Sequence, residues 1–430
     1  MSHIKNYILF NFFHIYEPSE VVNIVYGEDD GLSKIFIPDL SNGFFSKKSI
    51  IDTSKIVFKV VGGENIPFLF GVPDVNPFEM ANGKVVFNDD IFASAFYFLT
   101  GWQELSSTKD YLGRFEYEQS IQKRLHIIHV PVVNYYFRLL AKAVELAYGI
   151  KLKNKIHAEH TFITWVTHDV DIWANTWRAE LKSALKNFNI KSLSKLLLSI
   201  INGEYLENNF NIISELQNKY GFKSTYFFLP RQGKHLNTCN SDYNILKPRF
   251  RNIIQKLKLA GNEIGMHGGL TTSFDAKEFS SDRLKIGFDV NANRFHYLMF
   301  DMVLTPQLLE KNKIRIDSTL GFNSMPGFRN GTSYPFYLYN HETQQATSTL
   351  EMPLIIMDVS IFSPNYLGCL NAENGFTKLE PILNQIKKTG GYLTINWHNN
   401  YFSENGYLEW RRLFEMIVKY AKDNHCKFNP

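Results

Sequence analysis

The sequence predicts an α/β protein in two parts: a smaller α+β domain at residues 1–150 and a larger domain of parallel β/α units at residues 155–430. Two observations predict the larger domain. Short apolar runs alternate with helical patterns of about a dozen residues, which is typical of a parallel sheet, either open or closed into a barrel. Five of these runs also end in polar side chains, at the strand ends where such folds bind ligands.

The first 150 residues mix strand-like and helical patterns. Helices are expected over 89–105 and 132–149, where Asp89 or Asp90 can cap the first and Gly149 ends the second. The polar residues that follow Gly149 are typical of a linker. The strand-like runs are "VVNIVYG", "KIVFKVVG" and "IPFLFG" (21–27, 55–62 and 66–71).

The rest of the chain alternates strands with helices. The expected strands lie at 162–167, 223–230, 262–269, 315–320, 347–357 and 392–399, and the helices at 208–221, 248–261, 304–314 and 379–391. The polar residues at the strand ends are Asp169 with Asp171, His267, Asp317, Asp358 and His398. Packing alone does not readily explain five such strand ends, so we expect these side chains to share a site.

Composition and charge exclude several classes of protein. The content of 44% hydrophobic and 15% aromatic residues indicates a globular fold, and a net charge of +4 from scattered Lys and Arg gives no sign of nucleic-acid binding. The Lys-rich stretch 181–200 is interpreted as a solvated amphipathic helix, in preference to a membrane-surface helix.

Targeting signals are also weak. The apolar runs are too short to span a bilayer, no clear signal peptide begins the chain, and the three cysteines form no CxxC. We therefore expect a cytoplasmic protein without stable membrane insertion.

The stretch "THDVD" carries the first candidate site residues. Residues two apart in a strand point the same way, so Asp169 and Asp171 can face one pocket. Two close carboxylates repel each other unless a cation or a proton lies between them, so one becomes a metal ligand while the other stays a base. A divalent ion held by an Asp and a His can polarise a carbonyl and activate water. His398, on a separate strand, could protonate a leaving amine.

Five short motifs occur in the order found in polysaccharide deacetylases: "THDVD", "EIGMH", "RFHY", "EMPLIIMD" and "LTINWH" (167–171, 263–267, 294–297, 351–358 and 393–398). From about Thr161 onward the chain resembles carbohydrate esterase family four. The greatest resemblance is to a bacterial subgroup with an uncharacterised N-terminal domain. The segment "DYLGRF" (110–115) fits that domain, and "DSTLGF" and "GFRNGTSYPF" (317–322 and 327–336) fit the rest of the subgroup pattern. The resemblance implies a distorted β/α barrel that hydrolyses acetamido groups on amino-sugar polymers with zinc, or else cobalt, nickel or iron.

The resemblance also implies a role for each matched residue. The metal ligands are expected to be Asp171 and His267. The catalytic residues are expected to be the general base Asp169, the arginine that orients it, Arg294, the general acid His398, and its supporting acid, Asp358.

The expected metal site departs from the family pattern at one position. The second metal histidine should lie four residues after His267, where Thr271 stands. Catalytic zinc usually has three protein ligands. Three explanations stay open: His296 or His168 completes the site, metal binding is weak, or the pocket has lost metal-dependent catalysis.

Two further residues are predicted to bind the substrate. Arg329 could bind an anionic sugar substituent or orient a catalytic carboxylate, although its surroundings are also typical of an ordinary loop. Tyr297 could stack on a sugar ring, although most aromatic residues belong to a core. Two other pairs have spacings that suit a metal, but we expect neither to be functional, because no carboxylate or cysteine cluster accompanies them: His126 with His129, and His157 with His160.

The predicted function is removal of an N-acetyl (or O-acetyl) group from a sugar of a surface polysaccharide or its precursor. The lack of a secretion signal favours a lipid-linked or nucleotide-linked precursor. One alternative is a catalytically inactive relative that binds glycan or organises its assembly, because Thr271 replaces a ligand. The other is an amide hydrolase that acts on a small molecule.

Overall fold

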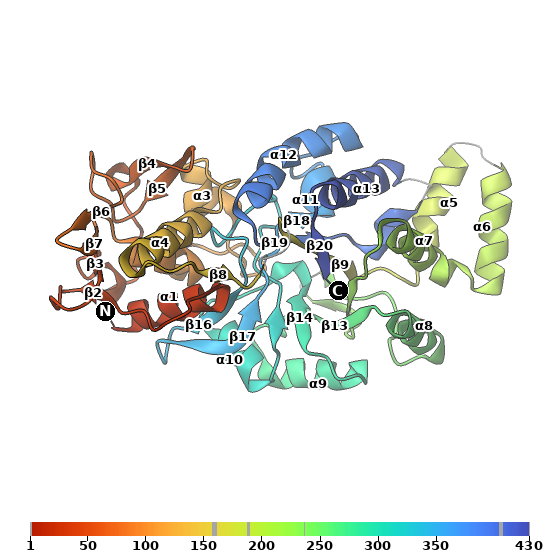
Figure 1. The fold of residues 1–430 in the computed structure, drawn as a ribbon. Helices are drawn as coiled ribbons and strands as arrows, with labels where there is room; N and C mark the ends of the chain where they lie inside the picture. The colour runs from red at the N-terminus through yellow and green to blue at the C-terminus, as the bar shows by residue number, and fades with distance from the viewer. Residues whose placement is uncertain (1, 157–160, 187–189, 236, 404–406, 430) are drawn as a thin grey trace.

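The computed structural model describes residues 2–156, 161–186, 190–235, 237–403 and 407–429. The molecule is elongated, with the N-terminal region (residues 2–149) at one end, a curled parallel sheet in the middle and a helical hairpin at the other end (Figure 1). The predicted α/β class is confirmed, and helices surround the central sheet as expected for a distorted β/α barrel.

The N-terminal region combines helices with two small sheets. One sheet has the order β2-β3-β7-β6, and β4 pairs with β5 in a hairpin. The strands are β1 (Tyr16–Glu17), β2 (Ile24–Gly27), β3 (Ile35–Pro38), β4 (Val57–Val61), β5 (Glu64–Phe68), β6 (Phe78–Ala81) and β7 (Lys84–Phe87). The helices are α1 (Ser2–Ile15), α2 (Ile91–Leu99), α3 (Ile121–Arg124) and α4 (Val132–Tyr148), with 3-10 turns at Phe44–Ser46, Thr53–Lys55, Trp102–Leu105 and Tyr117–Gln119.

Helix α2 is the centre of this region, because all of its residues are buried. Asp90 caps it by accepting a hydrogen bond from the backbone N–H of Ala93 at 2.8 Å, so of the two predicted caps Asp90 is the one used. Asp89 instead accepts from the ammonium group of Lys59. Gly149 ends α4 with φ 70°, the left-handed conformation that favours glycine at this position.

The larger sheet has the order β16-β17-β15-β14-β13-β10-β9-β19-β18. Its neighbours are parallel except for β16 and β17. The strands are β9 (Ile163–Val170), β10 (Thr225–Phe228), β13 (Glu263–Gly268), β14 (Ala292–Phe295), β15 (Ile316–Asp317), β16 (Phe336–Asn340), β17 (Gln345–Glu351), β18 (Ile356–Met357), β19 (Tyr392–Asn396) and β20 (Lys427–Asn429), the last paired with β9. Two short two-stranded sheets lie outside this sheet: β1 pairs with β8 (Lys153–Asn154), and β11 (Lys234–His235) pairs with β12 (Thr238–Cys239).

Helices connect these strands, as the alternating pattern predicted. They are α5 (Trp177–Lys186), α6 (Ile190–Asn202), α7 (Tyr205–Tyr220), α8 (Pro248–Leu259), α9 (Ala276–Ile286), α10 (Leu304–Lys311), α11 (Asp358–Phe362), α12 (Ala372–Thr389) and α13 (Leu408–Asp423), with 3-10 turns η5 (His296–Leu298) and η6 (Asn399–Phe402). The single helix expected over 181–200 is part of a hairpin of two helices, α5 and α6, which extends from the end of the molecule (Figure 1). Ile190, Leu197 and Ile201 of α6 are exposed there.

One predicted strand is divided, and the division brings the two sides of the sheet together. The strand expected at 347–357 forms β17, which pairs with β15, and then β18, which pairs with β19 on the opposite side. Between them, the N–H of Met352 donates to the carbonyl of Asp317, and that of Ile355 donates to Thr394. The chain itself therefore connects β15 to β19, and the parallel strands surround a common interior.

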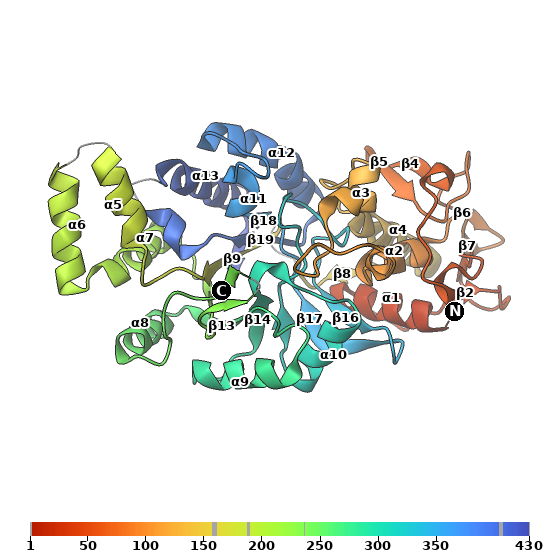
Figure 2. The same cartoon turned by 180° about the vertical axis from the view of Figure 1, so that it is seen from behind.

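The N-terminal region packs directly on the larger sheet. Figure 2 shows α1 beside β16 and β17, and Tyr7 donates its hydroxyl proton to the carbonyl of Tyr337 at 2.7 Å. The N–H of Tyr337 donates in turn to Oδ1 of Asn11 at 2.8 Å. One hydrophobic core runs through both parts of the chain. The boundary between two domains at about residue 150 stays a prediction.

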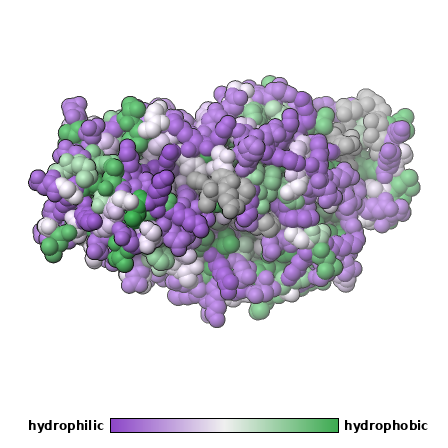
Figure 3. All heavy atoms as spheres, in the orientation of Figure 1, coloured by the Kyte–Doolittle hydropathy of each residue, from purple (hydrophilic) through white to green (hydrophobic). Residues whose placement is uncertain are grey.

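The surface is mostly polar. Hydrophilic residues cover most of the face that Figure 3 shows, and hydrophobic ones are scattered over it. Among the residues described, no helix has the length and apolar character required to cross a membrane. All three cysteines have free thiols.

Candidate metal and catalytic site

Strand β9 delivers two carboxylates to one side and a histidine to the other. Asp169 and Asp171 point into the interior between the strand ends, where they line a common pocket. His168 points to the opposite side, where its ring lies 4.9 Å from that of Tyr226 and its Nδ1 donates to the carbonyl of Trp397 at 2.7 Å. Burial lowers the pKa of His168 to about 4. His168 is therefore a neutral core residue away from the pocket.

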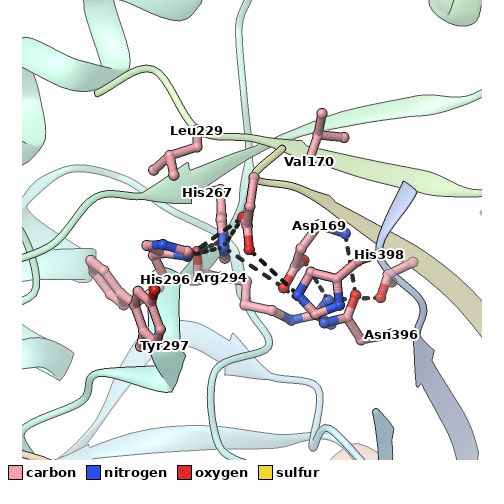
Figure 4. Close-up of polar contacts among 12 residues, drawn as sticks. Asp169, Val170, Leu229, His267, Arg294, His296, Tyr297, Asn396 and His398 are labelled. Atoms are coloured by element: carbon pink, nitrogen blue, oxygen red, sulfur yellow. Dashed lines mark hydrogen bonds and ion pairs between the residues drawn. The ribbon is translucent and has the colours of Figure 1, made fainter. Parts of the chain in front are cut away.

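Three side chains converge at the end of β9 in the way a metal site requires. They are Asp171, His267 from β13 and His296 from the turn after β14. Figure 4 shows the two histidines side by side. Nε2 of His267 lies 3.1 Å from Oδ1 of Asp171 and 3.1 Å from Nδ1 of His296. Nδ1 of His296 lies 3.4 Å from the same Asp171 oxygen.

The proton positions on the two imidazoles follow from their outer partners. Nδ1 of His267 lies 2.8 Å from the carbonyl oxygen of Arg294, and Nε2 of His296 lies 3.0 Å from that of Cys239. A carbonyl oxygen only accepts, so these two nitrogens carry protons and the inner nitrogens present lone pairs to Asp171. Oδ1 of Asp171 is buried and receives no hydrogen bond from the described residues. A second proton or a metal ion must lie between these groups.

These donors fit a divalent cation. A tetrahedral zinc ion with bonds of about 2.0–2.1 Å separates its ligand atoms by roughly 3.3 Å, and the separations here are 3.1, 3.1 and 3.4 Å. One carboxylate and two imidazoles are a ligand set used by catalytic zinc, with one position left for water or substrate. The carbonyls of Arg294 and Cys239, which accept from the outer ring nitrogens, orient the two imidazoles.

Thr271 is not part of this group. It has φ 73°, and its hydroxyl oxygen lies 2.9 Å from Oε2 of Glu278, on helix α9. His296 comes from a neighbouring strand end and lies where a third ligand is needed. Of the two histidines considered from the sequence, His296 is in the site and His168 is outside it.

Asp169 lies beside the metal-ligand group and is held by two partners. Oδ1 accepts from Nη1 of Arg294 at 2.9 Å, and Oδ2 accepts from Nδ2 of Asn396 at 2.8 Å. Arg294 is fully buried. Burial acts to raise the pKa of Asp169, but the positive charge of Arg294, with His267 and His398, outweighs it and holds that pKa below its ordinary value. Asp169 is therefore an ionised, oriented carboxylate, 3.8 Å from Nε2 of His267.

His398 approaches the group from β19. Its Nδ1 donates to Oδ1 of Asp358 at 2.8 Å, and its Nε2 lies 3.4 Å from Oδ2 of Asp171. Burial acts to lower the pKa of His398, but the carboxylates of Asp358 and Asp171 outweigh it and hold that pKa well above its ordinary value. The imidazole is therefore a proton donor directed into the pocket.

The pocket has a volume of about 290 Å³, at the lower end of the range for small-ligand sites. Its wall includes three tyrosines, Tyr297, Tyr366 and Tyr401. Tyr297 and Leu298 have φ 58° and 56°, two successive left-handed residues that are not glycine. Each such residue costs on the order of 1–3 kcal/mol and persists only where its surroundings enforce it. This strained turn directly follows His296.

Other candidates from the sequence lie elsewhere. The guanidinium of Arg329 is buried against Glu104, with Nη2 to Oε2 at 2.8 Å and Nε to Oε1 at 3.1 Å, so it does not line the pocket. Asp317 is buried beside Glu351 on the neighbouring strand. Among the described residues, His126 and His129 belong to no group that could hold a metal, and His157 and His160 lie outside the described residues.

Two residues of the site were missed from the sequence. Asn396 belongs to the "LTINWH" motif and could have been found by strand alternation, since it lies two residues before His398. Arg114 reaches the pocket from the N-terminal region, where Nη1 donates to the carbonyl of Tyr297 at 3.2 Å. No local pattern signals a contact between residues so far apart in the chain.

Comparisons with known proteins match the two parts of the chain separately. A family of unknown function, DUF7033, matches residues 2–149. No curated protein matches the chain. Several of the solved structures that it resembles are polysaccharide deacetylases or other members of carbohydrate esterase family 4.

Three solved structures show the extent of this likeness. A Mycobacterium smegmatis protein named as a polysaccharide deacetylase has 17% identity and a TM-score of 0.39, over 60% of this chain and 84% of that one. The Puue allantoinase has 12% identity and a TM-score of 0.42, over 63% and 87%. A Clostridium thermocellum family 4 acetyl xylan esterase, in complex with a cobalt ion, has 12% identity and a TM-score of 0.30, over 62% and 87%. At these identities the likeness is one of fold alone. Any activity of this chain must be argued from its own site residues.

Proposed function

We propose that this protein is a metal-dependent hydrolase that removes an N-acetyl (or O-acetyl) group from a sugar of a surface polysaccharide or its precursor. The observation that carries the proposal is the convergence of Asp171, His267 and His296 between an ionised Asp169 and a protonated His398. A three-donor cation site flanked by a base and an acid is suited to metal-assisted hydrolysis of an amide.

The ligands in this proposal are Oδ1 of Asp171, Nε2 of His267 and Nδ1 of His296. A divalent cation, with zinc the expected ion, supplies Lewis acidity toward the acetyl carbonyl and lowers the pKa of water. The two imidazoles bind as neutral ligands, because each keeps its proton on the outer nitrogen that donates to a backbone carbonyl. The site therefore requires its inner nitrogens to be deprotonated before the cation binds.

Asp169 acts as the general base. Arg294 and Asn396 each hold one of its oxygens, so the carboxylate is oriented toward the pocket and stays ionised. It accepts a proton from the water that attacks the acetyl carbon. The low pKa that Arg294 imposes makes Asp169 a weak base, which would be adequate toward water whose own pKa is lowered.

His398 acts as the general acid. Its Nδ1–H is bonded to Asp358, so the proton that can be transferred is on Nε2, which faces the pocket. This proton goes to the departing nitrogen as the carbon–nitrogen bond breaks, giving acetate and a free amine. The high pKa that Asp358 imposes keeps the imidazole charged at neutral pH.

The substrate we propose is an acetylated amino-sugar glycan or glycan precursor. The sequence motifs support the glycan class, and the tyrosines of the pocket wall offer ring faces for stacking on a sugar. The alternative of an inactive glycan-binding or assembly protein depends on the missing histidine at Thr271, and in this proposal His296 takes the place of that ligand. A small-molecule amide hydrolase remains a second candidate, because the pocket is small.

Two measurements test the proposal. Purified protein should contain close to one equivalent of zinc, cobalt, nickel or iron, and should release acetate from N-acetylated chito-oligosaccharides. Asp169→Asn should retain the metal and lose about 10²–10⁴-fold in kcat. Full activity of Asp169→Asn would remove the base from the mechanism. A chain without bound metal and without activity after metal is added would favour the binding protein.

A further inference from the structure

The N-terminal region contributes a segment to the wall of the catalytic pocket. Residues Asp110–Tyr117, here called the strap, run from the turn after His296 to the loop around Phe322. Arg114 lines the pocket together with Tyr297 and Asn323. The strap belongs to the part of the chain that matches the family of unknown function.

The first half of the strap is a turn fixed by Asp110. Oδ1 of Asp110 accepts from the backbone N–H groups of Leu112 and Arg114, at 2.9 and 2.8 Å. Its Oδ2 accepts from Nε of Arg114 at 2.8 Å, and Gly113 supplies the left-handed residue of the turn with φ 79°. The guanidinium is therefore held in one position, and its Nη1 donates to the carbonyl of Tyr297.

Leu112 gives the same turn an apolar contact with the barrel. It is buried in a small cluster with Leu270 and Met299. Met299 ends the strained turn, and Leu270 follows β13, which carries His267. The strap thus touches the segments that follow two of the three proposed ligands.

The second half of the strap packs on another pocket loop. Phe115 and Tyr117 are buried against Phe322, with ring centroids 6.1 and 5.4 Å apart. The next residue, Asn323, lines the pocket and donates to the hydroxyl of Tyr366 at 2.9 Å. Two walls of the pocket are therefore supported from the N-terminal region.

We propose that the N-terminal region is a structural component of the catalytic site, and that Arg114 is a positioning residue for His296. Tyr297 and Leu298 hold left-handed conformations that their side chains disfavour, so an external contact must stabilise the turn. Arg114 supplies it through the Tyr297 carbonyl, and Leu112 through Met299. The direction in which His296 points is set by this turn. The role for His296 rests on the proposed function, whereas the support of the turn does not.

The test uses the full chain with Arg114→Met, which keeps an unbranched stem but removes the donors, and with Arg114→Lys, which retains a cation. The matched control is Arg412→Met, because Arg412 pairs with Glu409 and Glu373 on the outer surface. Hydrogen exchange of the peptide covering 293–300, measured without metal, should be about tenfold faster in Arg114→Met, intermediate in Arg114→Lys and unchanged in Arg412→Met. The affinity for cobalt, from its absorption spectrum in competition with a chelator, should fall about 10–100-fold in Arg114→Met.

The hydrogen-exchange measurement tests the role of the strap, and the cobalt-affinity measurement also tests the proposed metal site. A wild-type chain that binds no cobalt contradicts the metal site, while the exchange measurement still decides whether the strap supports the turn. If Arg114→Met does not fold, Leu112→Ala provides the same measurement, since it removes only the contact with Met299 and Leu270. Exchange of 293–300 within twofold of wild type in the folded variants would overturn the proposal.

Discussion

Asp358 binds His398 twice: Oδ1 accepts from the ring Nδ1 at 2.8 Å, and Oδ2 accepts from the backbone N–H at 2.6 Å. Asp358 begins α11 directly after β18, and His398 lies two residues after Asn396, the last residue of the adjacent β19. The parallel register of these two strands therefore brings a carboxylate and an imidazole together at one edge. The double contact fixes both the orientation of the ring and the tautomer that leaves Nε2 as the acid.

The first prediction concerns the pH dependence of activity. Because Asp358 raises the pKa of His398, Asp358→Asn should lower that pKa. The acid form of His398 would then be lost at a lower pH, so the basic limb of the kcat–pH profile should move toward acid. Asp52→Asn, at an exposed surface carboxylate, is the control. A basic limb that stays in place would mean that another group supplies the proton.

His296 is predicted to be required for the metal, and Thr271 is not. His296→Ala removes the third donor and should lower the affinity for zinc or cobalt by more than about 100-fold. Thr271→Val should leave the affinity unchanged, since the Thr271 hydroxyl bonds to Glu278 instead of facing the site. Isothermal titration calorimetry of both variants decides the point. Equal losses in the two would place the third ligand elsewhere.

The buried pair of Arg294 and Asp169 is predicted to be a strong determinant of stability. Arg294→Met would leave Asp169 buried without its cation, and loss of one partner of a buried pair costs about 3–5 kcal/mol. The pKa of Asp169 should rise in the same variant, because its largest favourable charge is gone. Urea unfolding measures the free energy, with Arg412→Met, at the exposed surface, expected to have little effect. Equal values for the two variants would contradict this prediction.

The sequence predicted the central sheet and most of the site because both depend on local patterns. Strand alternation places Asp169 and Asp171 on one side, and parallel strands bring His267, His398 and Asp358 to the same edge. The same rule applied strictly would have excluded His168, which must point away from its neighbour Asp169.

The features that the sequence did not reveal depend on contacts between distant residues. Arg329 carries no local sign that Glu104, 225 residues away, neutralises it. The same holds for Arg114 and Tyr297, which are 183 residues apart. Helix α1 was not recognised, although its buried residues lie on one face, because the apolar Leu9, Phe10 and Phe13 lie off that face and hide the stripe.

Arg329 is predicted to stabilise the fold, and the expectation that it binds substrate can be tested in the same experiment. Glu104→Gln should lower the free energy of unfolding by about 3–5 kcal/mol, because it leaves the buried guanidinium without a counter-charge. Replacing both residues by Met should recover much of that loss. In the folded double variant, KM should be unchanged. A KM raised about tenfold or more would support the prediction from the sequence that Arg329 binds the substrate.

The last prediction concerns the buried acids Asp317 and Glu351. Adjacent strands hold them side by side, and Oε2 of Glu351 has no hydrogen-bond partner among the described residues. Burial, followed by the charge of Asp317, raises the pKa of Glu351 well above its ordinary value, and burial raises that of Asp317 as well. Glu351 is therefore neutral in the folded chain at a pH where it is ionised in the unfolded chain.

A raised pKa in the folded state favours folding below the unfolded pKa of about 4.3, and this contribution is lost as the pH rises toward the folded pKa. The loss amounts to about 1.4 kcal/mol per pH unit for one proton. Glu351→Gln has the same shape and no proton to lose, so its Tm should rise relative to wild type as the pH increases from 5 to 9. Glu342→Gln, at an exposed position, should show no such trend. A constant difference in Tm between Glu351→Gln and wild type across this range would show that Glu351 is ionised in the folded protein.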